Sequence, residues 1–406
     1  MQTTLSPALQ HNTEAREAAS LIRACVHCGF CQATCPTYQV LGDERDSPRG
    51  RIHLIKQFLE GEGTTAQTQL HLDRCLTCRA CETACPSGVQ YGRLVELGRG
   101  LLVQAQPRPW LQRQVRSALA AALTGPLFAP AVRIGRLLRK VLPQRLRDHL
   151  PAAVPAGAWP QAVHPRTVLL LTGCVQPALA PRINAATARV LDALGITALV
   201  AAEAGCCGAI HQHLDATEQA RAAARRNIDA WWPAIEAGAE AVVANTSGCG
   251  SMLRDYAVLL QHDAAYAARA AALVTLVRDL SEVVAPQAQQ LRSRLSSPVQ
   301  ARLVFQAPCS LQHAQRIRGS VEALVSTLGA TLLPAGDALL CCGAAGTYSL
   351  LQPHISTQLR DRKQAALTAA QPQVILSANL GCMLQLAAGS DVPVQHWVEW
   401  VDSQLT

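Results

Sequence analysis

The second half of the chain alternates short apolar runs with longer alanine-rich stretches, twice over. In the first round we predict strands at 168–171, 196–200 and 241–244, separated by helices at 178–194 and 214–237. In the second round we predict strands at 303–305, 331–333 and 374–376, with helices at 321–328 and 355–370. Continuous apolar strands that alternate with helices predict parallel sheets with helices on both faces.

Each round carries a matched set of cysteines just after its predicted strands. The first set is Cys174, Cys206, Cys207 and Cys249, and the second is Cys309, Cys341, Cys342 and Cys382. The lone cysteine precedes the Cys-Cys-Gly (CCG) turn by 32 residues in both rounds, and the rounds are offset by 133 to 135 residues, which indicates a domain duplication. The carboxyl edge of a parallel sheet is where α/β folds place ligand sites. We therefore consider an iron–sulfur or zinc centre in each round; the alternative is that these cysteines are small buried hydrophobic residues.

Two identical cysteine ladders occupy the first hundred residues. Each has the spacing C-x2-C-x2-C-x3-C-P, which is typical of bacterial proteins with two [4Fe–4S] clusters, where the fourth thiolate crosses to the other cluster. We predict that one cluster is bound by Cys25, Cys28, Cys31 and Cys85, and the other by Cys75, Cys78, Cys81 and Cys35.

Zinc and disulfides are the alternatives for the ladders. Zinc also accepts four thiolates but needs only two CxxC pairs per metal, so the unbroken ladders favour iron–sulfur clusters. Residues 1–24 contain Glu14, Arg16, Glu17 and Arg23 and lack an apolar core, so we expect no secretory signal. We expect a cytoplasmic protein, in which sixteen cysteines indicate metal or redox chemistry rather than crosslinks.

Length and composition place the chain among multidomain soluble proteins. Its 406 residues are 49% apolar and 4% aromatic, and the net charge of +8 comes without the aromatic–basic interleaving of nucleic-acid-binding proteins. We expect an α+β multidomain fold, in which a helical two-[4Fe–4S] ferredoxin-like domain is followed by two tandem α/β repeats. The expected boundaries are 1–105 for the ferredoxin-like domain, 106–165 for a basic helical linker, and 166–285 and 286–406 for the repeats.

The predicted linker has an unusual charge pattern. Residues 108–147 contain nine basic residues and no acidic one: Arg108, Arg113, Arg116, Arg133, Arg136, Arg139, Lys140, Arg145 and Arg147. The uncharged stretch 117–132 is too short and too broken by Gly and Pro to span a bilayer. The segment is either a linker packed on its own domains or a partner subunit, which we favour, or a basic amphipathic segment on the anionic inner leaflet.

A few further residues are candidates for roles near these cysteines. His211, His213 and His313 are possible ligands or proton-transfer groups, although ordinary polar packing is the commoner role. Arg49 and Arg51 follow the first ladder, where cationic groups favour the reduced, more negative state of a cluster. The same segment also predicts a helix over 51–59, with Ser47 as N-cap and Pro48 at its first position. No dinucleotide-binding, P-loop, HExxH or GxSxG motif is present, so we expect no active site in this chain.

Several segments resemble the iron–sulfur subunit of bacterial glycolate oxidase. The resemblance is carried by residues 23–38, 42–43, 47–52, 71–78, 227–240, 247–250 and 311–315. The ladders and CCG pairs alone indicate a wider superfamily that includes the cluster subunit of anaerobic glycerol-3-phosphate dehydrogenase, lactate-utilisation proteins and the CCG subunit of heterodisulfide reductase.

The resemblance implies a subunit without flavin in a glycolate dehydrogenase. Flavin-binding partner subunits would oxidise glycolate to glyoxylate, and this chain would pass the electrons through two [4Fe–4S] clusters toward a membrane quinone, from the inner face of the cytoplasmic membrane. In the wider superfamily the repeats often end in CxxC and hold a non-cubane centre. Here Thr246 and Asn379 replace the first cysteine of that pair, which argues against such a centre. The alternatives are a related dehydrogenase of lactate or glycerol-3-phosphate, or a disulfide-reductase-type enzyme that uses the CCG cysteines.

Overall fold

The computed structural model describes residues 1–141 and 150–405. These form two compact units. The smaller unit comprises Met1–Ser117 with Leu339–Arg362, and the larger comprises Ala118–Ala338 with Lys363–Thr406. Arg145 and Arg147 of the basic segment lie outside the described residues. The domain boundaries expected from the sequence remain a proposal.

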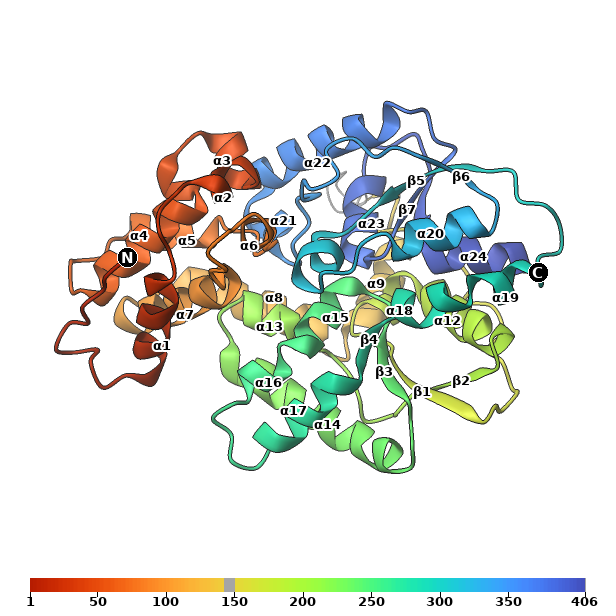
Figure 1. The fold of residues 1–406 in the computed structure, drawn as a ribbon, viewed down its shortest axis with the longest axis horizontal. Helices are drawn as coiled ribbons and strands as arrows, with labels where there is room; N and C mark the ends of the chain where they lie inside the picture. Colours follow the sequence, from red (N-terminus) through yellow and green to blue (C-terminus); the bar gives the residue numbers. More distant parts are fainter. Residues whose placement is uncertain (142–149, 406) are drawn as a thin grey trace. The chain divides into compact units, whose positions relative to one another are not determined.

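The smaller unit is helical (Figure 1). Its core lies between α1, α4 and α7, where Ala18, Ile55 and Leu94 are completely buried. Gly98 of α7 lies so close to Ile55 that a Cβ atom at Gly98 would be 2.7 Å from Ile55 Cδ1. The elements are α1 (Thr13–Arg23), α2 (Phe30–Ala33), α3 (Pro36–Leu41), η1 (Glu44–Asp46), α4 (Pro48–Leu59), α5 (Ala66–Asp73), α6 (Ala80–Thr83), α7 (Tyr91–Ala105) and α21 (Tyr348–Leu351).

The start of α4 agrees with the prediction from sequence. Ser47 is the N-cap, its Oγ accepts a hydrogen bond of 3.0 Å from the Gly50 amide, and Pro48 occupies the first turn. Gly50 is required here, because a Cβ atom would lie 2.0 Å from the carbonyl oxygen of Glu44. This helix start brings Arg49 and Arg51 to the ladder cysteines.

The larger unit contains two parallel four-stranded sheets, one per repeat (Figure 1). Their strand orders, β2-β1-β3-β4 and β6-β5-β7-β8, are equivalent. The six predicted strands are present, and each sheet adds a fourth strand, β4 or β8, that we did not predict. The bounds are β1 (Arg166–Leu171), β2 (Ile196–Leu199), β3 (Ala241–Ala244), β4 (Val277–Asp279), β5 (Arg302–Gln306), β6 (Thr331–Leu333), β7 (Val374–Ser377) and β8 (Val394–His396).

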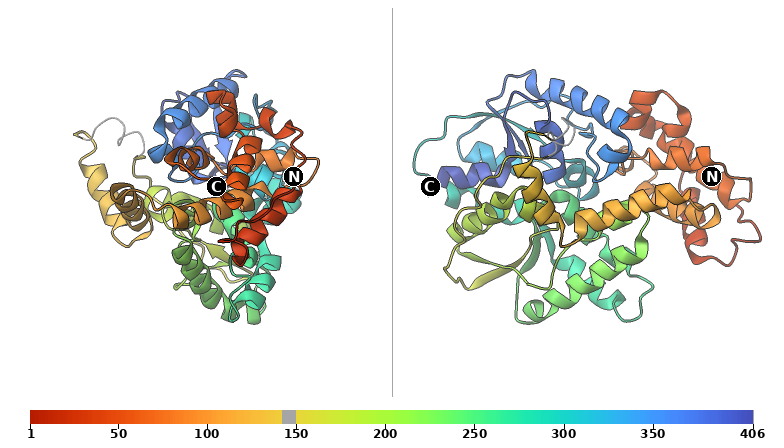
Figure 2. Two further views of the ribbon diagram at one scale, coloured as in Figure 1. Left: turned by 90° about the vertical axis from the view of Figure 1, so that its left-hand side faces the viewer. Right: turned by 180° about the vertical axis from the view of Figure 1, so that it is seen from behind.

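Helices cover both faces of these sheets, as the apolar strands require (Figures 1 and 2). On β1, Leu169 packs in a cluster with α14, while Val168 packs on the opposite face in a cluster with α12. The helical elements of this unit are α9 (Phe128–Leu137), α11 (Gln176–Leu179), α12 (Pro181–Ala193), α13 (Ala209–His213), α14 (Thr217–Glu236), α15 (Ser247–Arg254), α16 (Tyr256–Leu259), α17 (Ala267–Leu276), α18 (Leu280–Val284), η2 (Ala285–Gln287), α19 (Ala288–Arg292), η3 (Ser310–Ala314), α20 (Ser320–Thr327), α22 (Pro353–Thr368), α23 (Leu380–Ala387) and α24 (Trp397–Leu405). Helix α8 (Trp110–Thr124) and α22 each continue from one unit into the other.

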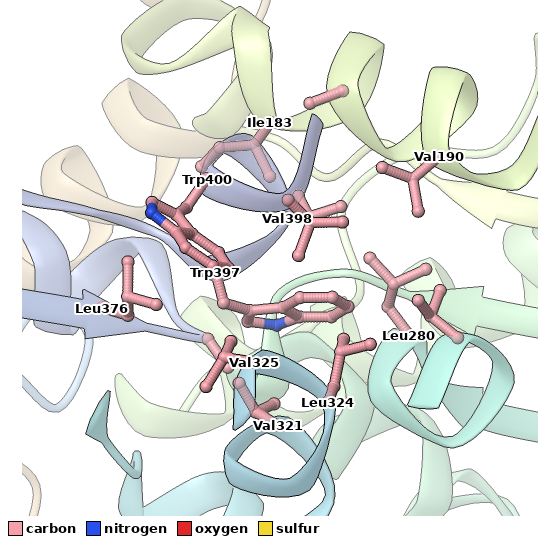
Figure 3. Packing of buried hydrophobic residues seen from close by; sticks show 14 of the residues in the cluster. Ile183, Val190, Leu280, Val321, Leu324, Val325, Leu376, Trp397, Val398 and Trp400 are labelled. Carbon is pink, nitrogen blue, oxygen red and sulfur yellow. The ribbon is translucent and has the colours of Figure 1, made fainter. Parts of the chain in front are cut away.

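One apolar core joins the two repeats. Trp397 of α24 is 1% exposed and packs among residues of α12, α18, α20 and β7 (Figure 3). Arg189 of α12 forms an ion pair of 2.6 Å with Asp402 of α24, so the last helix of the second repeat is fixed to the first repeat. The shared core explains why the repeats form one compact unit.

Within residues 1–141 and 150–405, no single helix is long and apolar enough to cross a membrane. Among the described helices, only α8 and α9 taken together have the length and apolar composition of a membrane span, and the two helices meet at an angle of 87°.

Candidate metal centres

The two ladders share one backbone path. In the first, His27 and Gly29 have φ angles of +57° and +88°, and in the second Thr77 and Arg79 have φ angles of +51° and +57°. Left-handed backbone at a non-glycine residue is uncommon and indicates a locally imposed turn. The turn brings the Thr77 amide to 3.4 Å from the Cys75 Sγ, as a donor to the sulfur. The same left-handed turns at equivalent positions indicate that both ladders bind the same kind of group.

A pocket beside the first ladder gathers the first predicted tetrad. It is lined by Cys25, Cys28, Cys31 and Cys85, together with Cys81. The fourth residue of the tetrad therefore comes from the other ladder, fifty-four residues beyond Cys31. Cys28 is exposed, and so are the apolar side chains of Val26 (67%) and Phe30 (66%) in the same loop.

A second pocket gathers the second predicted tetrad. Its lining includes Cys75, Cys78, Cys81 and, from the first ladder, Cys35. Two of its ligand candidates contact hydroxyl groups: Thr37 Oγ1 lies 3.3 Å from Cys35 Sγ, and the Tyr91 hydroxyl donates to Cys75 Sγ at 3.8 Å. Sequence reasoning missed both hydroxyl groups.

The charge requirements of these thiols fit an iron–sulfur cluster. Burial, with Cys78, Cys75 and Cys35 nearby, raises the pKa of Cys81 well above the ordinary thiol value. Burial and the neighbouring Cys25 raise the pKa of Cys31 to about 11. Burial and crowding therefore disfavour the thiolate form of Cys31 and Cys81, and a bound metal offsets this cost, as iron does in a thiolate-ligated cluster.

The cysteines of the first repeat also come together. Cys174 and Cys207 both donate hydrogen bonds to Cys206, and the bond from Cys174 is the first cause of the lowered pKa of Cys206. Cys207 in turn contacts Cys249 through a thiol hydrogen bond. Two hydrogen bonds fix the Cys206–Cys207 turn. Asn227 Nδ2 donates to the Cys206 carbonyl at 3.0 Å, and the Tyr256 hydroxyl donates to the Cys207 carbonyl at 2.8 Å.

The cysteines of the second repeat are divided between the two units. Cys309 and Cys382 belong to the larger unit, whereas Cys341 and Cys342 belong to the smaller one. Asn379 donates from Nδ2 to Cys382 Sγ at 3.4 Å and accepts from the Gly248 amide at 3.2 Å through Oδ1. At the position of the absent CxxC cysteine, an amide therefore contacts the remaining sulfur.

The sequence matches known families over these same regions. Residues 21–89 match the family described as a 4Fe-4S dicluster domain, and residues 168–254 and 303–387 each match the cysteine-rich CCG domain. The chain is 50% identical to the glycolate oxidase iron-sulfur subunit of Escherichia coli K12, over 100% of this chain and 99% of that protein. The chain belongs to the family of glycolate oxidase iron–sulfur subunits.

More distant relatives also match the chain. The probable glycolate oxidase iron-sulfur subunit of Bacillus subtilis 168 is 32% identical over 90% of this chain and 88% of that protein. Lactate utilization protein A of an Exiguobacterium species is 25% identical over 57% of this chain and 95% of that protein. The family assignment confirms the predicted fold class: a helical domain for two [4Fe–4S] clusters followed by two CCG domains, each with a parallel sheet.

The two arginines that follow the first ladder differ in their environment. Arg49 is partly exposed and forms an ion pair with Glu44 at 2.8 Å. Arg51 is buried; its Nη1 donates to Thr37 Oγ1 at 3.1 Å and its Nε to the His71 carbonyl at 2.6 Å. Arg51 thereby reaches the sulfur of Cys35 through one hydroxyl group, whereas Arg49 lines the first pocket.

The three histidines near the CCG cysteines differ in their surroundings. His211 Nε2 lies 3.4 Å from Thr124 Oγ1, and its charge contributes to the lowered pKa of Cys206. His213 ends helix α13, and His313 is buried in η3. A ligand role for these three side chains remains a prediction.

The basic segment divides into two groups of side chains. Arg108 and Arg116 are bound to Asp73 of the smaller unit at 2.5 and 3.0 Å, and Arg136 donates to the Leu179 carbonyl of the larger unit at 3.1 Å. Arg113, Arg133, Arg139 and Lys140 are exposed, as are the apolar side chains of Leu127, Ile134, Leu137, Leu138 and Val141. The first group contacts residues of its own unit, and the second group faces outward. The interpretation of this segment as a linker remains a prediction.

Proposed function

We propose that this chain is the electron-transfer subunit of a glycolate dehydrogenase complex and binds its two clusters through crossed tetrads. Cys25, Cys28, Cys31 and Cys85 hold one cluster; Cys75, Cys78, Cys81 and Cys35 hold the other. The observation that carries the proposal is that each tetrad lines one pocket, including its member from the other ladder.

The chemistry divides between this chain and its partners. Oxidation of glycolate to glyoxylate releases two electrons and two protons, which a flavin in a partner subunit accepts. A [4Fe–4S] cluster supplies storage and release of one electron at a time. The residues of this chain hold the thiolates, bury Cys35, Cys75 and Cys81 of the second pocket, and place hydrogen-bond donors on the Cys75 sulfur.

The flavin of the partner subunit approaches this chain on the side of the first pocket. Cys28 is exposed there, and Val26 and Phe30 present apolar surface on the same loop. Exposed aromatic and aliphatic side chains are the usual anchors of protein interfaces. We therefore assign electron exchange with the flavin subunit to the loop that carries Cys28.

The acceptor in this proposal is a membrane quinone, reached from the inner face of the cytoplasmic membrane. Helix α9 lies at the outside of the larger unit (Figure 2). Leu137, its last residue, is 84% exposed, and Val141, four residues further along, is 78% exposed. Exposed Arg139 and Lys140 lie between them in the sequence. Exposed apolar side chains on either side of a pair of cations suit an anionic lipid surface, where each basic residue contributes about 1 kcal/mol.

The test of electron transfer separates the two halves of the reaction. In the anaerobically purified complex, Cys28→Ser should alter one cluster and abolish electron flow from glycolate to a quinone analogue. Reduction of the flavin by glycolate should continue at the unmodified rate. Quinone reduction that survives loss of a cluster would overturn the proposal, as would a complex that reduces its flavin with lactate and not with glycolate.

We also propose that the first repeat holds a further thiolate-bound centre, either iron–sulfur or zinc. The support is the chain of sulfur contacts from Cys174 through Cys206 and Cys207 to Cys249. Metal analysis of the complete protein should show metal beyond the eight irons of two [4Fe–4S] clusters. Cys207→Ser should remove only that excess, and an unchanged metal content would refute the centre.

A further inference from the structure

A segment of the second repeat belongs to the smaller unit, with the ladders. Residues Leu339–Arg362 include the CCG turn, α21 and the first part of α22. The Tyr348 hydroxyl donates to the carbonyl of Arg74 at 3.0 Å, and Arg362 Nη1 donates to Gln39 Oε1 at 2.7 Å. These two bonds join the segment to both ladders, because Gln39 follows Cys35 and Arg74 precedes Cys75.

The CCG turn in this segment is rigid. Gly343 has a φ angle of +86°, and a Cβ atom there would lie 2.6 Å from the Ser356 carbonyl oxygen. The Ser356 hydroxyl donates to the Gly343 carbonyl at 2.9 Å. Cys341 and Cys342 are 2% and 1% exposed. The positions of these two cysteines are therefore fixed relative to Tyr348, six residues further along.

Tyr348 acts on the peptide that leads into a proposed cluster ligand. The Arg74 carbonyl belongs to the same peptide group as the Cys75 amide. Cys75 is otherwise held by donors on its sulfur, from Thr77 and Tyr91, and on its carbonyl, from Arg99 Nη2 at 2.8 Å. The hydrogen bond from Tyr348, which lies 274 residues from Arg74 in the sequence, adds a donor to the peptide group that precedes Cys75.

The surroundings keep Tyr348 a donor. Its side chain is buried, at 6% exposure of the residue, and burial raises the pKa of its phenol, with Cys75 and Cys341 acting in the same direction and Arg51 opposing them. The phenol of Tyr348 thus lies close to one cysteine of the second tetrad and to one of the CCG pair. A change of charge at a buried group is screened far less than one at an exposed group, so a change at either cysteine can affect the other site.

We propose that Tyr348 is a positioning residue of the second pocket and that it couples the Cys341–Cys342 pair to the cluster held there. A change of charge at the pair, such as metal binding, then shifts the reduction potential of the second cluster and leaves that of the first unchanged. The inference rests on the ligand assignment proposed above, and the coupling is reciprocal, because each site changes the other by the same free energy.

The experiment is a redox titration of the complete, cluster-loaded protein followed by EPR. Signals are assigned first with Cys28→Ser for the first cluster and Cys78→Ser for the second. Tyr348→Phe should shift the midpoint potential of the second cluster to more negative values, because a donor that stabilises added negative charge is lost. Cys341→Ser should also shift the second cluster alone, and by a different amount in the Tyr348→Phe background.

The control is Tyr266→Phe, which removes a hydrogen bond of 2.7 Å to Asp229 on the surface of the larger unit. It should leave both potentials unchanged. Iron loss in Tyr348→Phe that is confined to the second cluster would also support the positioning role, and Cys341→Ser would then test the coupling. Potentials unchanged in both variants, or equal shifts of both clusters, would overturn the inference. If Cys28→Ser and Cys78→Ser fail to separate the signals, the ligand assignment fails instead.

Discussion

Arg51 and Asp46 form an ion pair inside the smaller unit. Arg51 Nη2 lies 3.3 Å from Asp46 Oδ1, and the two side chains are 1% and 0% exposed. The second carboxylate oxygen binds Arg74 Nη1 at 3.0 Å, so one acidic group serves two arginines. The pair also fixes Thr37, whose hydroxyl contacts both Arg51 and Cys35. The charge balance of the second pocket therefore depends on Asp46.

Replacement of Asp46 by Asn should destabilise the smaller unit strongly. It leaves two arginines without their counter-charge, one of them wholly buried, and loss of one partner of a buried pair costs about 3–5 kcal/mol. Urea unfolding under anaerobic conditions, followed by cluster absorbance, measures the effect. Asp43→Asn is the control, because Asp43 forms a surface pair with Arg45 worth less than about 1 kcal/mol. Equal stabilities of the two variants would contradict this account.

The crossing of the ladders makes a prediction about pairs of variants. Cys35→Ser should alter the same EPR signal as Cys78→Ser, although Cys35 lies in the other ladder, because both line the second pocket. Cys85→Ser should match Cys28→Ser by the same reasoning. Uncrossed ligation would instead pair Cys35→Ser with Cys28→Ser. Power-saturated EPR spectra of the four reduced proteins distinguish the two patterns.

Much of the fold could be predicted because the strands have a clear physical pattern. β3 is a continuous apolar run buried on both faces, and its predicted bounds agree with the structure. β4 and β8 were missed because each has three residues with a polar one in the middle, Arg278 or Gln395, and pairs with only one neighbour. Such a strand forms because it pairs with the edge of an existing sheet, and this tertiary pairing is not encoded in the local sequence.

The candidate site was predictable only as far as its cysteines. Their spacing carries the chemistry, so the sequence predicts both tetrads and shows the duplicated CCG sets; the structure lines one pocket with each predicted tetrad. Thr37, Tyr91 and Tyr348 were missed because a single hydroxyl has no distinguishing pattern, and the Tyr348 bond joins residues 274 positions apart. The burial of Arg51 was also unexpected, since its burial depends on the tertiary position of Asp46.

His396 should make the larger unit sensitive to acid. Burial lowers the pKa of this side chain from 6.5 to about 4, so the fold favours the neutral ring. The neutral ring therefore contributes about 3 kcal/mol to the free energy of unfolding. This contribution is fully present above pH 6.5 and is lost as the pH falls to 4. His396→Asn keeps an acceptor for the Val398 amide, which now donates to the ring Nδ1 at 3.2 Å, but cannot gain a proton. Denaturant midpoints from pH 7 to pH 4 should fall less steeply in the variant, and parallel curves would contradict the assignment.

The exposed end of α9 should bind anionic lipid. Val141→Gln combined with Leu137→Gln should weaken co-sedimentation of the chain with phosphatidylglycerol vesicles at least about tenfold, since burial of a Val or Leu side chain contributes about 1.5–3 kcal/mol. Arg139→Gln with Lys140→Gln should weaken it further and reduce its dependence on salt. Val163→Gln is the matched control, because Val163 is 85% exposed and lies outside this segment. If α9 instead contacts a partner subunit, the α9 variants should sediment with vesicles like the unmodified chain and fail to assemble into the complex.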